Sequence, residues 1–240
     1  MLQAVPTADL ETYDDCLASS AFRENLDDLN ARLAFRLRRF GAPEELNGNL
    51  FYDHMTPNFV DAELDPKCED KRRRLFEIAR RGDLMVEIGV NGGHSLFLAK
   101  SANPDLRIIG IDIARQVRRR WARVDVYVPE AMKWFTEKYP GDCRFIIGDS
   151  RLEAPRLAVE YPETRIDILH VDGAKSTYFT DVVNLLPLMH PGTIIILDDS
   201  NITMVRRCAR QLIRAGLVEH HPEFPPETEL AHQHLILRPV

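Results

Sequence analysis

The fold is decided by residues 84–95, which read LMVEIGVNGGHS. A short apolar run carries one acid, Glu87, and then breaks into a loop with three glycines, of which Gly89 and Gly93 are the first and the last. Residues 95–100 follow with a helix-like pattern. A buried strand that opens through a glycine-rich turn into a helix is how α/β folds build a nucleotide-sized pocket. The stretch therefore predicts an α/β fold with a ligand-binding turn at this point.

The spacing of the glycines narrows the kind of ligand. Glycine lets the backbone adopt positive φ and lets a ligand approach closely, while the helix N-terminus adds free N–H groups. The loop reads Glu-x-Gly-x-x-x-Gly from Glu87, and not the Gly-x-Gly-x-x-Gly of dinucleotide-binding loops. It resembles the first motif of the class I S-adenosylmethionine (SAM) methyltransferases. The resemblance implies that Glu87, Gly89, Gly93 and Ser95 bind SAM, and a tight turn without a ligand is the alternative.

Composition and charge argue against several other classes. The 240 residues are 45% hydrophobic and 28% charged, with a formal net charge of −6, which is typical of a soluble globular protein. The acidic balance argues against nucleic acid as a partner, and no apolar run is long enough to predict a membrane span. The N-terminus lacks a signal-peptide pattern, and the four cysteines are isolated from one another. These features predict a cytoplasmic protein with free thiols.

Residues 1–65 are predicted to be a helical extension followed by a lid-like loop. Apolar residues recur at steps of three and four on one helix face, at Leu26, Leu29, Leu33, Leu37 and Phe40. That face is interpreted as a lid or as the surface of a homodimer or higher homo-oligomer, with simple packing on the sheet as the alternative. The loop at 44–65 holds Tyr52 and His54. It would cover a bound cofactor or substrate, although a loop histidine is more often solvated.

Two runs of arginine lie on predicted helices. Residues 67–82 predict a helix whose apolar positions face inward and whose Arg72–Arg74 are exposed to solvent. The run Arg115–Arg123 predicts either a solvated or intersubunit helix face or a contact to an anionic group of the substrate. Pro129 suits the first turn of the next helix.

Acids follow the second and third predicted strands. Asp112 lies at the end of the strand at 107–113, about twenty residues past the glycine loop, where a carboxylate accepts hydrogen bonds from ribose hydroxyls. Asp149 and Ser150 follow the strand at 143–147, in the position where the methyltransferases that this chain resembles bind the adenine amino group. The alternatives are a turn residue for Asp112 and a helix N-cap for Asp149.

Two further strands end in carboxylates. The strand at 165–171 is followed by Asp172, and the strand at 193–197 is followed by Asp198 and Asp199. The carboxyl ends of parallel strands meet at one sheet edge, so these carboxylates converge and raise one another's pKa. A hard divalent cation relieves the repulsion, and oxygen ligands suit Mg²⁺. The sequence therefore predicts a metal site at the three acids, with helix capping and solvent exposure as the alternative.

The next motif narrows the resemblance. Asp172, Lys175 and Tyr178 form Asp-x-x-Lys-x-x-Tyr, and an acid pair ends the following strand. This looks like the metal-dependent O-methyltransferases of the catechol and caffeoyl-CoA type and their relatives that methylate sugars and other hydroxyls in natural-product pathways. The resemblance implies that Asp172, Asp198 and Asp199 bind the metal, that Asp172 also borders the cofactor, and that Lys175 is the general base with a pKa lowered by the cation. Asp199 departs from the family's usual Asn, and the role of Tyr178 stays open.

The C-terminal part is predicted to close the sheet. Residues 202–215 predict a helix, and 217–224 and 232–237 predict a terminal antiparallel strand pair. Four histidines lie in this part, namely His220, His221, His232 and His234. They have no regular spacing for metal ligands, and alternation along strands explains them.

The sequence as a whole predicts an α/β domain at residues 66–240 with a Rossmann-like, doubly wound, seven-stranded and mostly parallel sheet. The expected function is Mg²⁺-assisted methyl transfer from SAM to a hydroxyl of a small molecule, which is a phenolic, catechol-like or natural-product acceptor. The first alternative is a non-catalytic accessory protein that binds SAM or a nucleotide. The second is a nicotinamide-dependent oxidoreductase, whose Gly-x-Gly-x-x-Gly loop this chain lacks.

Overall fold

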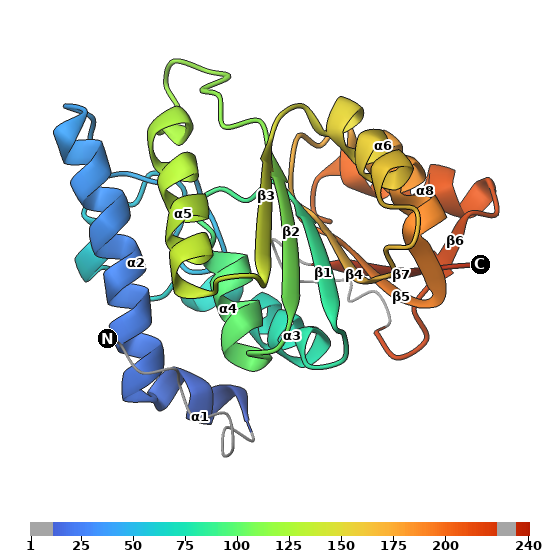
Figure 1. The fold of residues 1–240 in the computed structure, drawn as a ribbon, viewed down its shortest axis with the longest axis horizontal. Helices are drawn as coiled ribbons and strands as arrows, with labels where there is room; N and C mark the ends of the chain where they lie inside the picture. The colour runs from blue at the N-terminus through green and yellow to red at the C-terminus, as the bar shows by residue number, and fades with distance from the viewer. Residues whose placement is uncertain (1–11, 225–233) are drawn as a thin grey trace.

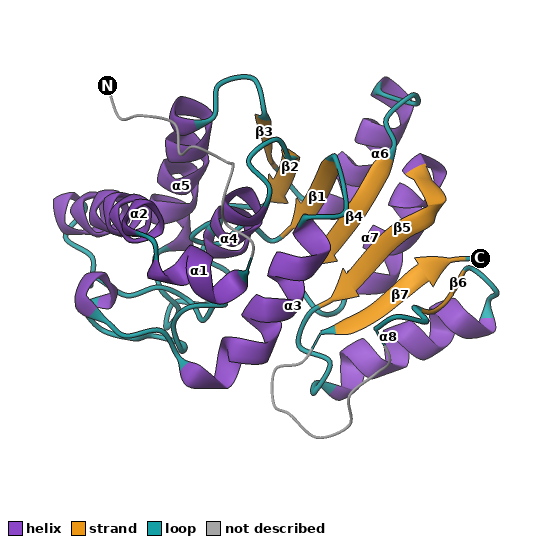
Figure 2. Ribbon diagram, turned by 90° about the horizontal axis from the view of Figure 1, so that it is seen from below, coloured by secondary structure: helices purple, strands orange, loops and turns teal. Residues whose placement is uncertain are grey.

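The core of the molecule is a twisted, mostly parallel sheet (Figures 1 and 2). The computed structural model describes residues 12–224 and 234–240. Within these residues lie seven strands, β1 (Leu84–Ile88), β2 (Arg107–Asp112), β3 (Cys143–Ile147), β4 (Ile166–Val171), β5 (Met189–Leu197), β6 (Val218–His220) and β7 (Leu235–Pro239). They are ordered β3-β2-β1-β4-β5-β7-β6, and only β7 runs antiparallel to its neighbours. The predicted fold class and terminal antiparallel pair are confirmed.

Helices cover both faces of the sheet, as the sequence predicts (Figure 1). One face carries α3 (Glu69–Ala79), α4 (His94–Ala102) and α5 (Val124–Lys138), with α1 (Tyr13–Ala18) and α2 (Ser20–Arg39) outside them. The other face carries α6 (Ser150–Glu160), α7 (Tyr178–Leu185) and α8 (Thr203–Arg214). Three short 3₁₀ helices, η1 (Phe59–Asp61), η2 (Pro66–Cys68) and η3 (Leu186–Leu188), lie in the described connections. Each face has its own buried apolar cluster, because alternate strand residues point to opposite sides.

The strand order reverses between β1 and β4, and this reversal positions the site. From β1 the chain crosses through α4 to β2 on one side, and β4 later joins β1 on the other side. Ligands of open α/β sheets bind outside the carboxyl ends of the strands at such a point. The loops after β1 and β4 approach closely there, since a Cβ on Gly89 would lie 2.6 Å from the backbone carbonyl of Asp172. Gly89 also has a φ of +94°, so both the space and the conformation require glycine.

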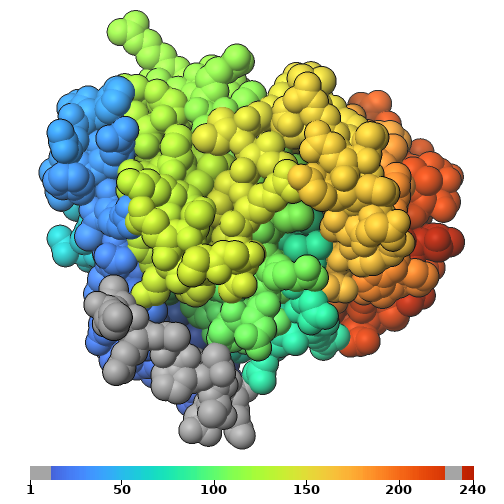
Figure 3. All heavy atoms as spheres, viewed as in Figure 1, coloured from blue at the N-terminus to red at the C-terminus, as the bar shows by residue number. Residues whose placement is uncertain are grey.

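The N-terminal extension packs on α5 and not directly on the sheet. Figure 3 shows the blue N-terminal segment against the yellow-green surface of this helix. The buried members of the predicted stripe are Leu26, Leu29, Leu33 and Leu37. Phe40 is 55% exposed, so its assignment to the stripe is wrong, because it follows the last residue of α2. Trp134 donates to Asp28 at 2.6 Å and Arg32 pairs with Glu130 at 2.9 Å, which ties α2 to α5. A homodimer or higher homo-oligomer stays a prediction.

Two predictions around α5 are wrong. Residues 115–123 form a loop instead of a helix, and this loop rises above the carboxyl edge of the sheet (Figure 1). Helix α5 begins at Val124, so Pro129 lies inside the helix and not in its first turn. The earlier start buries Val126 and Tyr127 in the apolar cluster on this face. Burial of these side chains therefore outweighs the poor fit of proline inside a helix.

The predicted exposure of Arg72 is also wrong. Its guanidinium is buried and donates to the backbone carbonyls of Leu50 at 2.7 Å and Asp65 at 2.8 Å. These carbonyls belong to the loop at 44–65, so α3 holds this loop against the domain. The predicted 217–224 strand is shorter, at Val218–His220, and His232 lies outside the described residues.

None of the helices in the described part of the chain combines the length and the apolar character needed to cross a bilayer.

Candidate active site

A cavity of about 630 Å³ lies at the carboxyl edge of the sheet. Its walls come from the segments that follow five strands and from the loop at 47–54. Four residues that were predicted to bind the cofactor border it, namely Gly89, Asp112, Asp149 and Ser150. The four residues of the predicted reactive centre border it too, namely Asp172, Lys175, Asp198 and Asp199. One cavity thus brings together the two parts of the predicted site.

Asp112 lies at the tip of β2 and holds the loops beside it. Its carboxylate accepts the backbone N–H of Ala114 at 2.7 Å and of Asn91 at 3.1 Å. Burial raises the pKa of Asp112 from its ordinary value, although these backbone donors oppose the shift. The glycine loop and the loop after β2 are therefore fixed on either side of one carboxylate that borders the cavity.

Asp149 and Ser150 begin α6. Asp149 caps the helix by accepting the backbone N–H of Arg151 at 3.0 Å, which is the N-cap role that the sequence offered as an alternative. Its carboxylate also accepts from the Arg151 guanidinium, and this hydrogen bond lowers the pKa of Asp149. Ser150 donates to Asp181 at 2.7 Å. Both residues border the cavity, and adenine binding stays a prediction for them.

Glu87, Gly93 and Ser95 lie behind the cavity and do not line it. Glu87 is fully buried and accepts from the Ser95 hydroxyl at 2.5 Å, while its other close partner is His170 Nδ1 at 2.6 Å. Gly93 precedes α4 with a φ of +79°, and a Cβ there would lie 2.6 Å from the Phe135 ring. These three residues shape the strand–loop–helix junction, and their direct contact with a cofactor stays a prediction.

The loop at 44–65 is fastened to the glycine loop, as a cover for the cavity requires. Tyr127 donates its hydroxyl to Asn91 at 2.6 Å and accepts the backbone N–H of Asn47 at 3.2 Å. Tyr52 and His54 both border the cavity. The Tyr52 hydroxyl accepts from Asn30 of α2 at 2.7 Å, so the N-terminal extension supports this wall.

The three acids of the predicted metal site converge as expected, but they are paired with lysines. Lys175 donates to Asp172 at 2.8 Å and forms an ion pair with Asp199 at 2.9 Å. Lys71 of α3 forms an ion pair with Asp198 and lies 3.9 Å from Asp199. The expectation that the three acids raise one another's pKa is therefore wrong for Asp198: burial alone would raise the pKa of this carboxyl, but the Lys71 ammonium outweighs it and lowers that pKa.

Lys71 is the functional residue that the sequence interpretation missed. Its side chain is 8% exposed, and it directly precedes the run Arg72–Arg74 that the sequence predicts to be solvated. A signal was present in the spacing: Lys71 precedes Leu75 by four residues and Ile78 by seven, so all three share the inward face of α3. A charged residue on an apolar helix face calls for a buried partner, and here that partner is Asp198.

The pKa shifts of Asp172 and Lys175 show how the charges in this cluster affect one another. Burial and the neighbouring Asp198 raise the pKa of Asp172 to about 7. Burial alone would lower the pKa of Lys175, but the surrounding carboxylates, Asp172 first, outweigh it and raise that pKa. The predicted lowering of the Lys175 pKa is therefore absent with the charges of this chain alone, and Lys175 is an ammonium at neutral pH. Tyr178 is buried, and its hydroxyl accepts from Lys175 at 2.8 Å.

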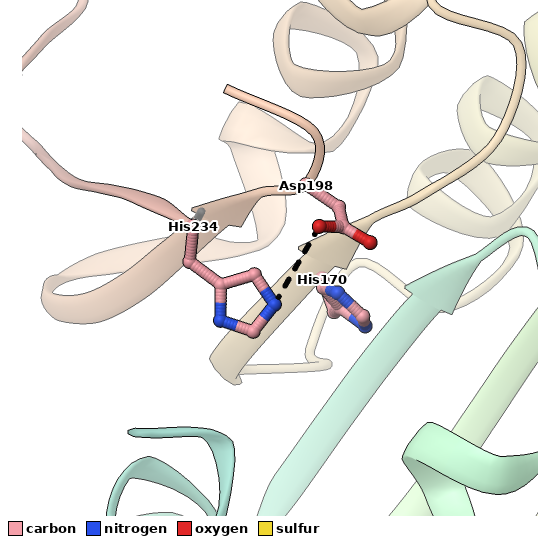
Figure 4. Close-up of side chains that lie close together, drawn as sticks. All are labelled: His170, Asp198 and His234. Carbon is pink, nitrogen blue, oxygen red and sulfur yellow. Dashed lines mark ion pairs between the residues drawn. The ribbon is translucent and has the colours of Figure 1, made fainter. Parts of the chain in front are cut away.

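A second group of donors lies beside Asp198. His170, Asp198 and His234 present ligand atoms that all lie within 4.8 Å of one another, and all three residues are buried (Figure 4). His234 Nε2 lies 3.7 Å from Asp198 Oδ1. The sequence interpretation did not single out His170, and it explained His234 by strand alternation. That alternation is what brings both imidazoles to one face of the sheet.

Comparison with known proteins relates this geometry to a family. A family model described as a methyltransferase domain matches residues 86–200. The O-methyltransferase TomG from Streptomyces achromogenes, solved with SAM, has a TM-score of 0.57 at 20% identity, covering 89% of this chain and 90% of that one. An O-methyltransferase from Bacillus cereus, solved with SAH, has a TM-score of 0.57 at 15% identity, covering 92% of this chain and 91% of that one.

A third solved structure has the same fold. CalS11, described as a TDP-rhamnose 3′-O-methyltransferase of calicheamicin biosynthesis, has a TM-score of 0.53 at 16% identity, covering 91% of this chain and 93% of that one. A search of curated protein sequences gave no significant match.

Proposed function

We propose that this chain transfers the methyl group of SAM to a hydroxyl of a small molecule, because residues 86–200 match a methyltransferase domain and the fold is that of solved O-methyltransferases. The observation that carries the proposal is the single cavity that borders both the glycine loop with Asp112 and the cluster around Lys175. A cofactor on the first side and an acceptor on the second would meet inside a volume of about 630 Å³.

The cofactor side of the cavity has the features that SAM needs. Gly89 lets the loops after β1 and β4 pack together at the border of the cavity, where a side chain would meet the backbone of Asp172. Asp112 offers carboxylate oxygens for the ribose hydroxyls, and Asp149 and Ser150 border the position expected for adenine. When bound, SAM supplies a sulfonium methyl group that an oxygen nucleophile can attack.

The acceptor side has to bind a hydroxyl and remove its proton. Lys175 borders the cavity and is held between Asp172, Asp199 and the Tyr178 hydroxyl, so its ammonium is fixed in position. We assign Lys175 as the general base of the reaction. This role requires its pKa to fall, because the adjacent carboxylates now raise it. Holding the acceptor in place next to the methyl donor would lower the barrier by as much as about 7–11 kcal/mol.

The proposal also includes a divalent cation that assists the transfer. The donor set fits a hard ion, since Asp172, Asp198 and Asp199 offer only oxygens and all three border the cavity. Mg²⁺ held by these carboxylates would supply positive charge that favours ionisation of the acceptor hydroxyl and the neutral form of Lys175. Its binding has to compete with Lys71, which is paired with Asp198.

The acceptor is proposed from the residues that line the cavity and from what the names of the solved structures say of those proteins. The walls of the cavity include His54, Trp121 and Val124, which suit an aromatic or glycosidic molecule with free hydroxyls. The names of TomG and CalS11 place those proteins in natural-product pathways. We propose a phenolic, catechol-like or sugar-bearing natural product as the acceptor of this chain.

The proposal is tested by measuring SAH formation from SAM with a panel of catechols, phenols and glycosides, before and after chelation with EDTA. Acceptor-dependent SAH that falls with EDTA and recovers with Mg²⁺ supports both parts. Acceptor-dependent SAH that EDTA leaves unchanged removes the cation and keeps the transferase. Tight SAM binding with no acceptor-dependent SAH across the panel favours the accessory protein.

A further inference from the structure

Three buried side chains from neighbouring strands meet on one face of the sheet. His170 pairs with Ile196 in the register of β4 and β5, and Leu197 pairs with Leu235 in the register of β5 and β7. One residue beyond that pair, Asp198 follows β5 and His234 precedes β7, so both turn toward the same face. His170 shares this face because its pairing partner Ile196 lies two residues before Asp198, and strand residues two apart point the same way. The register of three strands thus builds the cluster in Figure 4.

The imidazoles in this cluster have nitrogens without partners. Among the described residues, nothing hydrogen-bonds to His170 Nε2 or to either ring nitrogen of His234, and all these atoms are buried. Buried polar atoms normally form hydrogen bonds, so each buried atom without a partner needs an explanation. One explanation is that the atom binds a metal ion. One ring nitrogen of each imidazole and one carboxylate oxygen of Asp198 all lie within 4.8 Å of one another.

Glu87 orients His170 in the way that metal-binding histidines are oriented. It is fully buried and lies 2.6 Å from His170 Nδ1. A carboxylate that holds one ring nitrogen fixes the ring and directs the other nitrogen to the metal. Orienting His170 is therefore a role for Glu87, which does not line the cavity.

We propose that His170, His234 and Asp198 bind one divalent transition-metal ion, with Glu87 as the residue that orients His170. Two imidazoles and one carboxylate suit Zn²⁺, Mn²⁺ or Fe²⁺ and not Mg²⁺, which prefers oxygen ligands. Ligand atoms at about 2.0–2.2 Å from a tetrahedral ion lie about 3.3–3.6 Å apart, so the ligand atoms, which now lie within 4.8 Å of one another, have to move closer together to form the site. The ion reaches it from the cavity, because Asp198 borders both.

Lys71 is the competitor of this ion. Its ammonium pairs with Asp198 in the described structure and lies 3.9 Å from Asp199. Metal entry at Asp198 moves the ammonium to Asp199, which already lies within ion-pair distance. Removing the ammonium therefore strengthens metal binding instead of weakening it. The site shares Asp198 with the oxygen-only site of the proposed function and differs from it in its two imidazole ligands, and it stands even if the chain transfers no methyl group.

The test is titration of the EDTA-stripped full chain with Co²⁺, followed by visible absorption. Histidine-ligated Co²⁺ in a four- or five-coordinate site absorbs strongly, whereas six-coordinate Co²⁺ with oxygen ligands absorbs weakly. We expect one strongly absorbing Co²⁺ per chain, which excess Mg²⁺ does not displace. His234→Gln is expected to weaken Co²⁺ binding at least tenfold, Glu87→Gln about 10–100-fold, and Lys71→Met to tighten it.

Two variants serve as controls. His190→Gln changes a histidine at the other end of β5, which pairs with Asp167 at 3.0 Å, and is expected to leave the spectrum unchanged. Asp172→Asn removes a ligand of the oxygen-only site and is expected to leave the strong bands in place. Thermal melts of each variant verify folding, and His170→Gln replaces His234→Gln if the latter fails to fold. Weak bands in the wild type, or bands that survive loss of either histidine or vanish only in Asp172→Asn, overturn the proposal.

Discussion

The two sides of the cavity are built in different ways. On the cofactor side, Asp112 and Asp149 are held by backbone N–H groups two residues away or in the adjoining glycine loop. On the acceptor side, Asp198 is held by Lys71, which comes from a helix 127 positions earlier in the numbering. The first side depends on local chain geometry, and the second depends on long-range packing and on charge balance. Substitutions on the acceptor side should therefore affect both chemistry and stability, whereas those on the cofactor side should mainly affect binding.

Lys175→Met is expected to have the largest effect on activity. Loss of a general base lowers kcat by about 10²–10⁴-fold, while the Kd for SAM changes little because the cofactor side is untouched. Steady-state kinetics gives kcat, and calorimetry with SAM gives the Kd. Lys133→Met, at an exposed lysine of α5, is the matched control and is expected to behave like the wild type. Equal loss of kcat and SAM affinity in Lys175→Met would show that the two sides are not separable in this way.

Lys71→Met is expected to cause the largest loss of stability. It leaves Asp198, whose side chain is 6% exposed, as a buried charge without this partner. Breaking a buried ion pair costs about 3–5 kcal/mol of unfolding free energy, measured by urea denaturation. The double variant with Asp198→Asn should recover most of this loss. A Lys71→Met variant as stable as the wild type would mean that the pair contributes nothing to the acceptor side.

Asp112→Asn tests the cofactor side alone. Hydrogen bonds to a charged group contribute about 1.5–3 kcal/mol, so the Kd for SAM should rise about 10–100-fold while kcat at saturating SAM changes little. Calorimetry with SAM measures the change, and Asp105→Asn, at an exposed acid just before β2, is the control. A normal Kd in Asp112→Asn would contradict the ribose assignment.

The pH dependence of stability tests a single carboxylate of the acceptor side. The pKa of Asp172 is raised to about 7 in the folded chain, above its ordinary value of 3.8. A raised pKa means that the folded state holds the proton more tightly, so this stabilising contribution is present below about pH 4 and is lost as the pH rises through about 7. Asp172→Asn removes this dependence, and the variant should gain at most about 4 kcal/mol relative to the wild type between pH 4 and pH 8. A constant difference in unfolding free energy across that range would contradict the assigned pKa.

The fold and the cofactor side could be predicted from the sequence because their signals are local. The strands β1 to β4 follow from short apolar runs, and Asp112 and Asp149 follow from the turn after each strand. The three acids of the acceptor side could also be placed, since parallel strands end at one edge. Their partner Lys71 was missed, because a single strand-and-turn pattern does not show which helix packs over that edge.

The remaining errors have a common cause. The His170–His234 cluster depends on the register between β4, β5 and β7, which the periodicity of each strand alone does not fix. Arg72 and the start of α5 were misread because burial against the loop at 44–65 and the apolar cluster overrides local preference. Sequence patterns identify which residues carry charge, and long-range packing decides which charges meet.

The most direct test is a crystal structure of the chain with SAH bound. The cavity should hold SAH with its ribose hydroxyls on Asp112 and its sulfur directed toward the side of Asp172 and Lys175, leaving space for an acceptor between them. SAH bound elsewhere, or bound with its sulfur turned away from Lys175, would contradict the proposal that this cavity joins a methyl donor to a hydroxyl acceptor.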